Sequence, residues 1–272
     1  MSAASLWRDR VRAHHAQSLK AQGGEERAKD FWSPFVSAFM ADPRRANDPV
    51  VDRLAREARP EWTVLDVGSG AGRLALPLAL RCCHVTAVEP SESMLEALRQ
   101  GAREASIQNL TAVQGRWEEV EVAPADVVLC AHVLYGVEEV GPFARRLEAH
   151  ARERVLLLMF NRAPQSPLSP LWKLVHGEER VDLPGLRELL NVLWEMEIYP
   201  DLEMFPEAGP RAYESWEGAR DEFRRRLYVE PGTETDRRLE RAMAELLEER
   251  AAGFVVRGAA PLRLGLISWK PA

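Results

Sequence analysis

Five short apolar runs alternate with amphipathic, helix-like segments between residues 60 and 160, and this alternation constrains the fold more than any other feature. Continuous apolar runs are typical of strands that are buried on both faces, and the intervening helices allow right-handed crossovers between parallel strands. The pattern therefore predicts an α/β fold with a doubly wound, mostly parallel sheet covered by helices. The five predicted strands are TVLDV, HVTAVEP, NLTAVQG, ADVVLCAH and RVLLLMF.

Two more strands complete the expected sheet. EIYPDLEMFP and LRLGLISWK both read as strands, which brings the total to seven. Two charged helices, within YESWEGARDEFRRRLYVE and RRLERAMAELLEER, stand between them and predict a helical insertion that closes over a pocket as a lid. The expected units are an N-terminal helical cap over residues 1–58, a core over 59–205 and 253–272, and the insertion over 206–252.

The first predicted strand ends in a glycine-rich loop. Asp66 closes the strand, and Gly68, Gly70 and Gly72 follow at alternate positions before a helix begins. Such a turn uses backbone dihedrals that glycine adopts freely, and it brings bare backbone close to a ligand. Ligands of open parallel sheets bind at the carboxyl ends of the strands, so the loop predicts a small-molecule site.

The spacing of the glycines narrows the range of possible ligands. A phosphate-binding P-loop needs Gly-Lys followed by Ser or Thr, which is absent. The dinucleotide fingerprint needs glycines at positions 1, 3 and 6, but Arg73 and Ala75 occupy the sixth position in the two possible registers, which disfavours a nicotinamide-dependent reductase. Asp66 would repel a phosphate, whereas it would attract an ammonium or sulfonium group.

Three further clues lie at the ends of the next strands. Glu89 stands 17 residues after Gly72, where a carboxylate can accept hydrogen bonds from both hydroxyls of a ribose. Arg116, Trp117 and Glu118 follow the third strand, where an adenine ring could stack or form hydrogen bonds. The fourth strand is followed by a histidine and a tyrosine that would face the reacting centre. These are His132 and Tyr135.

Taken together, residues 64–160 resemble a class I S-adenosylmethionine-dependent methyltransferase. VLDVGSGAG is similar to the first motif of that family, AVEPSESML to its second, and DVVLCAHVLYGV to its fourth-strand segment. Arg116-Trp117 departs from the pattern, because many relatives carry a short acidic residue there. The resemblance implies a Rossmann-like fold, S-adenosylmethionine as cofactor, and His132 and Tyr135 as candidate catalytic residues. It implies these cofactor-binding residues: Asp66, Gly68, Ser69, Gly70, Gly72, Glu89, Pro90, Met94, Gly115, Arg116, Trp117, Ala131 and His132.

The implied reaction is an in-line displacement, in which the protein chiefly aligns a nucleophile and excludes water. A base is needed only when the acceptor must lose a proton early. No NPPY-like segment follows the fourth strand, which disfavours methylation of an amide or nucleobase nitrogen. We therefore expect a small-molecule acceptor. Two alternatives stay open, a methyltransferase acting on protein or RNA, and a cofactor-binding protein without transferase activity.

Aromatic residues of the cap and insertion either wall the acceptor pocket or attach these helices to the core. His14, His15 and His176 read first as surface or core residues, with a place in the pocket as the alternative. Arg224, Arg225 and Arg226 read as a solvated helix face. The aromatic candidates are Trp7, Phe31, Trp32, Phe35, Trp172, Tyr213 and Trp216.

Charge and cysteine content exclude several classes of protein. The net charge is −6, so neither a nucleic acid nor an anionic membrane is expected as a partner. No apolar stretch approaches the roughly 18 residues that span a bilayer. Cys82, Cys83 and Cys130 lack zinc-ligand spacing, so we expect no metal, and we interpret all three as buried side chains in a reducing cytoplasm. The sequence leaves open the acceptor, the use of a base and the oligomeric state.

Overall fold

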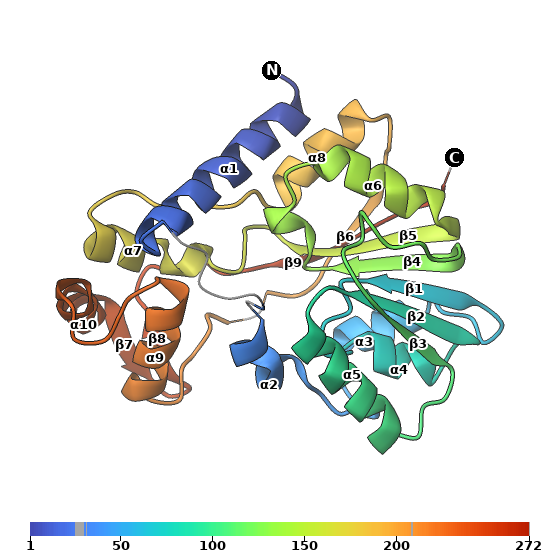
Figure 1. The fold of residues 1–272 in the computed structure, drawn as a ribbon, viewed down its shortest axis with the longest axis horizontal. Helices are drawn as coiled ribbons and strands as arrows, with labels where there is room; N and C mark the ends of the chain where they lie inside the picture. The colour runs from blue at the N-terminus through green and yellow to red at the C-terminus, as the bar shows by residue number, and fades with distance from the viewer. Residues whose placement is uncertain (25–29, 31, 208, 272) are drawn as a thin grey trace.

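The computed structural model describes residues 1–24, 30, 32–207 and 209–271 (Figure 1). Its main sheet has seven strands in the order β3-β2-β1-β4-β5-β9-β6. Neighbouring strands from β3 to β5 run parallel, whereas β9 is antiparallel to both β5 and β6. The predicted seven-stranded, mostly parallel sheet is therefore confirmed. The strands are β1 (Thr63–Val67), β2 (His84–Glu89), β3 (Leu110–Gln114), β4 (Ala125–Ala131), β5 (Ala151–Phe160), β6 (Asp201–Met204) and β9 (Leu264–Trp269).

Helices cover both faces of this sheet (Figure 1). One hydrophobic cluster joins the sheet to α1, α6 and α8, and includes Trp7, Phe143 and Leu189. A second cluster joins the opposite face to α3, α4 and α5, and includes Leu54 and Leu98. These helices are α1 (Ala3–Ala21), α3 (Pro49–Ala55), α4 (Ala75–Ala79), α5 (Glu92–Glu104), α6 (Val140–Ala149) and α8 (Leu186–Glu195).

Local sequence accounts for where several helices begin. Ser91 caps α5, because its hydroxyl accepts a hydrogen bond from the backbone N–H of Met94. In α1, the buried face consists of Trp7, Val11, His14 and Ser18, as the helical spacing predicts. The indole N–H of Trp7 also donates to the carbonyl oxygen of Val137, so α1 is attached to the loop that follows β4.

A helical unit stands apart from the sheet, at the left of Figure 1. It comprises α7, α9, α10 and the hairpin β7–β8, which share a third hydrophobic cluster centred on Trp172, Phe223 and Leu239. The expected boundary at residue 252 lies within the turn of this hairpin. The elements are α7 (Ser169–His176), α9 (Trp216–Arg226), α10 (Glu234–Leu246), β7 (Leu247–Arg250) and β8 (Gly253–Val256).

Three predictions about local structure were wrong, and one helix was not predicted. Helix α7 begins within the proline-rich run NRAPQSPLSP and continues to His176. Residues 247–250 leave the expected helix and pair with β8, because Leu247 is buried in the third cluster. The run AGRLALPLAL predicts a helix over residues 71–80, but only α4 forms, since the glycine loop occupies the first residues. Cys83 is exposed rather than buried, because it lies in the bend before β2.

A strap connects α1 to α3. We define it as Asp30 together with residues 32–48. It contains the 3-10 helix η1 (Ser33–Phe35) and the short helix α2 (Val36–Phe39), and α2 packs against α5. In the described part of the chain, no helix combines the length and the apolar character needed to cross a membrane.

Candidate methyltransferase site

The glycine loop leaves β1 with left-handed backbone. Gly68, Gly70 and Gly72 have φ values of 74°, 54° and 85°. A Cβ at Gly68 would lie 2.3 Å from Cγ2 of Val133, so a larger residue would clash with the turn after β4. A Cβ at Gly70 would meet no atom within 4 Å, and Gly70 therefore borders open space. The loop thus packs against the end of β4 on one side and is open on another.

Glu89 ends β2 beside this open backbone. One oxygen of its buried carboxylate, Oε2, accepts a hydrogen bond from the N–H of Gly70, and the other, Oε1, accepts one from the N–H of Ser91, both at 2.9 Å. Burial raises the pKa of Glu89, while these two hydrogen bonds act to lower it. The carboxylate is therefore fixed in place, and each oxygen keeps a lone pair that can accept a hydrogen bond from a ribose hydroxyl.

Asp66 is a second buried acid, and it lacks a partner. Its side chain is 2% exposed, and its Oδ1 has no hydrogen-bond partner among the described residues. Burial, followed by the nearby charge of Glu89, raises the pKa of Asp66 to about 7. A buried carboxylate oxygen without a partner is unfavourable unless a ligand compensates it. A cofactor that carries an ammonium group would supply that compensation, so the residues present fit S-adenosylmethionine.

The end of β4 forms the next wall of the site. His132 has a left-handed backbone, with φ of 61°, and its ring stacks on Phe160 with centroids 4.8 Å apart. Nδ1 of His132 lies 3.3 Å from the hydroxyl oxygen of Tyr135, which accepts a hydrogen bond from the N–H of Phe160 at 2.6 Å. The His132 side chain is exposed, yet the protein packed around it lowers its pKa to about 4. Both properties fit a ring that protein atoms surround on several sides and leave open on one.

Other residues of the expected cofactor site lie around these groups. Pro90 is exposed beside Glu89, Ala131 is half-buried at the end of β4, and Ser69 and Met94 are buried. Gly115 has φ of 150°, and a Cβ there would lie 2.5 Å from Cγ1 of Val120.

The residues after Gly115 divide between surface and core. Arg116 is exposed and pairs with Glu118 and Glu119. The ring of Trp117 is 3% exposed and packs 4.9 Å from the ring of His150. The structure therefore does not bring this indole to an open surface where an adenine could stack, and a cofactor contact through residues 116–117 stays a prediction.

Sequence reasoning missed Asp30. Its carboxylate accepts hydrogen bonds from the hydroxyls of Ser91 and Ser93, at 2.9 and 2.7 Å, and from the N–H of Ser93. Its charge also acts to raise the pKa of Glu89. Asp30 thus attaches the strap to the start of α5, beside the expected ribose position. An isolated acid before an aromatic run carries no signal for this contact, because the contact joins distant parts of the chain.

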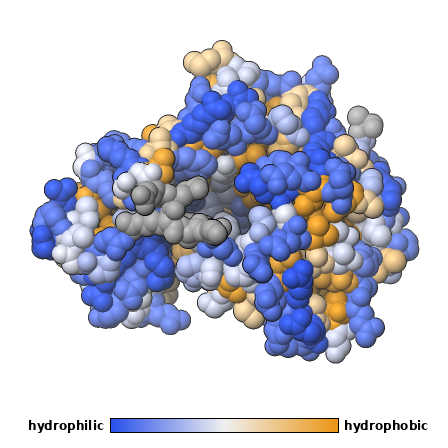
Figure 2. Space-filling view, in the orientation of Figure 1, coloured by the Kyte–Doolittle hydropathy of each residue, from blue (hydrophilic) through white to orange (hydrophobic). Residues whose placement is uncertain are grey.

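The space-filling view shows a hollow in the centre of the molecule, between the sheet and the helical unit (Figure 2). Most of the aromatic candidates, and the histidine candidates His14 and His176, are engaged in packing. Trp7, Trp172 and Tyr213 are buried, and Trp216 packs against Phe254. Phe35 lies under the guanidinium groups of Arg225 and Arg226, Trp32 is exposed, and Phe31 lies outside the described residues. His14 is buried against Arg180 and Val181, His176 contacts the carbonyl oxygen of Leu227, and His15 is exposed beside Gly136.

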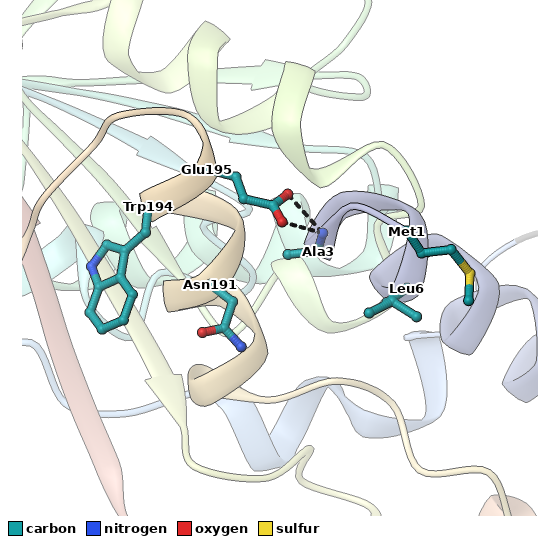
Figure 3. A pocket seen from close by; sticks show the side chains of 6 residues that line it. All are labelled: Met1, Ala3, Leu6, Asn191, Trp194 and Glu195. Carbon is teal, nitrogen blue, oxygen red and sulfur yellow. Dashed lines mark hydrogen bonds between the residues drawn. The ribbon is translucent and has the colours of Figure 1, made fainter.

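Two surface grooves lie outside the glycine loop. One, of about 470 Å³, lies between the start of α1 and the end of α8, where Glu195 accepts hydrogen bonds from the N–H of Ala3 (Figure 3). The other, of about 640 Å³, runs between the strap and α5. In the described part of the chain, no three His, Cys, Asp or Glu side chains are grouped to hold a metal ion.

Comparison with known proteins identifies a methyltransferase domain that includes the glycine loop. The family model described as a methyltransferase domain matches residues 64–153. The ubiquinone biosynthesis O-methyltransferase of Rickettsia felis is 34% identical over 90 residues, which cover 33% of this chain and 36% of that protein. The ribosomal RNA small subunit methyltransferase G of Bordetella pertussis is 30% identical over 140 residues, covering 48% of this chain and 58% of that protein.

Solved structures agree on the fold. The YcgJ protein of Bacillus subtilis superimposes with a TM-score of 0.56 at 17% identity, covering 81% of this chain and 97% of that one. The chain spans less than two thirds of the length of the curated relatives described above. The match over residues 64–153 contains the glycine loop, Glu89 and His132. Residues 64–153 therefore form a class I S-adenosylmethionine-dependent methyltransferase domain.

Proposed function

We propose that this protein binds S-adenosylmethionine in the glycine loop and transfers its methyl group to a small-molecule acceptor. The observation that carries the proposal is the pair of buried carboxylates at the ends of β1 and β2. Among the described residues, Oδ1 of Asp66 has no hydrogen-bond partner, and Glu89 is held against Gly70 with lone pairs free. Few ligands need one carboxylate for a cation and another for a ribose, and S-adenosylmethionine needs both.

Each residue of the site has a distinct task in this proposal. Glu89 accepts hydrogen bonds from the ribose hydroxyls, and Asp66 compensates the ammonium charge of the methionine part. The open backbone at Gly70 lets the ligand approach the loop closely. When bound, S-adenosylmethionine supplies a methyl group activated by a positively charged sulfur. The protein then has to align an acceptor with that methyl group and exclude water.

The packing of the loop supports a place for the acceptor beside His132. Val133 would clash with any side chain at Gly68, so the turn that carries His132 lies directly against the loop. The ring of His132 is exposed and stacks on Phe160, so this turn presents an aromatic surface beside the loop. An aromatic surface next to a cofactor loop suits a small-molecule acceptor. The catalytic roles of His132 and Tyr135 belong to this proposal.

Methyl-labelled S-adenosylmethionine tests this function. The protein would be incubated with three fractions of a cell extract: small molecules, total RNA and protein. We expect label in the small-molecule fraction, no transfer by Glu89→Ala, and normal transfer by Glu96→Ala, which removes an exposed carboxylate from α5. Label in RNA or protein alone would mean that the acceptor is a macromolecule and not a small molecule. Binding of the cofactor without transfer to any fraction would favour a protein without transferase activity.

A further inference from the structure

The hydroxyl of Tyr135 lies between two polar groups, a backbone N–H and a ring nitrogen. It accepts a hydrogen bond from the N–H of Phe160 at 2.6 Å, and it lies 3.3 Å from Nδ1 of His132. A backbone N–H can only donate, and the buried hydroxyl has no other acceptor among the described residues, so the hydrogen of the phenol points at Nδ1. Nδ1 must then accept this hydrogen bond, and a neutral His132 must carry its own hydrogen on Nε2.

The ring of His132 is restrained in this orientation. Its backbone N–H donates to the carbonyl oxygen of Leu158 at 2.9 Å, which continues the pairing of β4 with β5. The ring stacks on Phe160 and lies nearly parallel to the ring of Tyr135, with an interplanar angle of 12°. Nε2 has no hydrogen-bond partner among the described residues, and the side chain is exposed. The N–H at Nε2 is therefore available to a ligand.

We propose that Tyr135 is a positioning residue that fixes His132 as a hydrogen-bond donor to the methyl acceptor, and that the acceptor atom is a carboxylate oxygen. This inference rests on the proposed function, because it needs an acceptor beside the glycine loop. A histidine that presents N–H cannot take the proton of the acceptor in that tautomer. The low pKa of His132, caused by the protein packed around the ring and by the charge of Arg73, agrees with a ring that stays neutral at pH 7.

The acceptor class follows from the tautomer of His132, which cannot act as a base. Phenols and amines are mostly protonated at neutral pH and need a base, whereas a carboxylic acid with an ordinary pKa of about 4 is already ionised. The carboxylate oxygen forms a bond to the methyl carbon while the methyl–sulfur bond breaks. The electron pair of that bond stays on sulfur and cancels its positive charge. The product is a methyl ester, and no proton has to move.

The tautomer of His132 is the first test, and it needs no acceptor. Nitrogen NMR of the full-length protein with S-adenosylhomocysteine would report both ring nitrogens, with His132→Gln used for assignment. We expect a hydrogen on Nε2 and none on Nδ1 in the natural protein. Tyr135→Phe should give a mixture of tautomers, whereas Tyr213→Phe, which removes another buried phenol, should leave the spectrum unchanged. A hydrogen on Nδ1 in the natural protein would overturn the positioning role, whether or not Tyr135→Phe folds.

The chemical stability of the labelled product is the second test. A methyl ester releases labelled methanol in mild alkali, whereas methyl ethers and methylamines keep their label. We expect volatile label from the small-molecule product, and non-volatile label would overturn the carboxylate. His132→Gln, which keeps an N–H donor, should retain transfer within tenfold, while His132→Ala should lose about ten- to a hundredfold. Equal losses in both variants would contradict the donor role. If no fraction takes up label at all, the proposed function fails, while the tautomer still tests Tyr135.

Discussion

The two buried acids of the site, Asp66 and Glu89, illustrate how burial affects a single residue. Glu89 is buried with two backbone hydrogen bonds, so its charge is partly compensated in the free protein. Asp66 is buried with an unpartnered oxygen, and its pKa rises to about 7 from a normal value of 3.8. The free protein therefore holds Asp66 in an unfavourable state that a bound cation would relieve.

Substitution of Asp66 tests this state through the pH dependence of stability. Because the pKa is higher in the folded protein, the folded state binds the extra proton, and stability decreases as pH rises from about 4 to about 7. Without cofactor, Asp66→Asn should match the natural protein near pH 4 and be more stable at pH 8, on the order of 1–3 kcal/mol. Urea unfolding at both pH values measures this. Equal stability of the two proteins at pH 8 would mean that the charge of Asp66 is already compensated.

The positions of Asp66, Glu89 and His132 could be predicted because each ends a strand. In a parallel sheet the carboxyl ends of the strands meet at one edge, so chain order alone brings them together. The burial of Trp117 and the contact of Asp30 with Ser91 could not be predicted, because each depends on packing between segments distant in sequence.

At the scale of elements, the strap is attached to the site through one short chain of hydrogen bonds. Asp30 accepts from Ser91, and the N–H of Ser91 donates to Glu89. Farther along the strap, Phe35 contacts Arg225 and Arg226 of α9. The strap therefore links the expected ribose position to the helical unit.

Loss of this attachment should weaken cofactor binding without destroying it. Asp30→Ala removes the contacts with Ser91 and Ser93, and we expect the dissociation constant for S-adenosylmethionine to rise about three- to tenfold. Asp42→Ala is the matched control, since Asp42 lies in the same strap and bonds only locally, to the N–H of Arg44, among the side-chain hydrogen bonds of the described residues. Similar affinities in both variants would contradict a role of the strap at the site.

The boundaries of most strands and of α5 follow from periodicity and capping, which are local. Helix α7 and the hairpin β7–β8 do not, since their burial depends on one another. Residues 247–250 continue a helical pattern, yet Leu247 and Val256 are buried together in the cluster that includes Trp172. Tertiary packing thus overrides the local preference for helix.

At the scale of the whole molecule, the hollow has two walls of different construction (Figure 2). The sheet and its helices form one wall, and the helical unit forms the other. Within the helical unit, Arg224 bonds both oxygens of Asp236 at 2.8 Å, and the N–H of Gly232 bonds Asp236 as well. Asp236 is only 6% exposed, so this pair holds α9 against the start of α10.

Breaking this pair should affect the acceptor side more than the cofactor side. Asp236→Ala leaves Arg224 without its main partner, and the helical unit should lose about 1–3 kcal/mol of stability. Hydrogen exchange should then speed up in α9, α10 and the hairpin, and methyl transfer should fall, while affinity for S-adenosylmethionine stays within threefold. Glu234→Ala, which removes exposed ion pairs from the same helix, is the control. A comparable loss of cofactor affinity in Asp236→Ala would contradict two separately stabilised walls.

Calorimetric titration of S-adenosylmethionine into the purified protein tests the central claim most directly, with Glu89→Ala, Glu96→Ala and NAD as comparisons. The account predicts micromolar binding to the natural protein and to Glu96→Ala, a loss of about ten- to a hundredfold in Glu89→Ala, and no binding of NAD. Absence of S-adenosylmethionine binding to the natural protein, or equal binding to Glu89→Ala, would contradict the assignment of the glycine loop and Glu89 as the cofactor site.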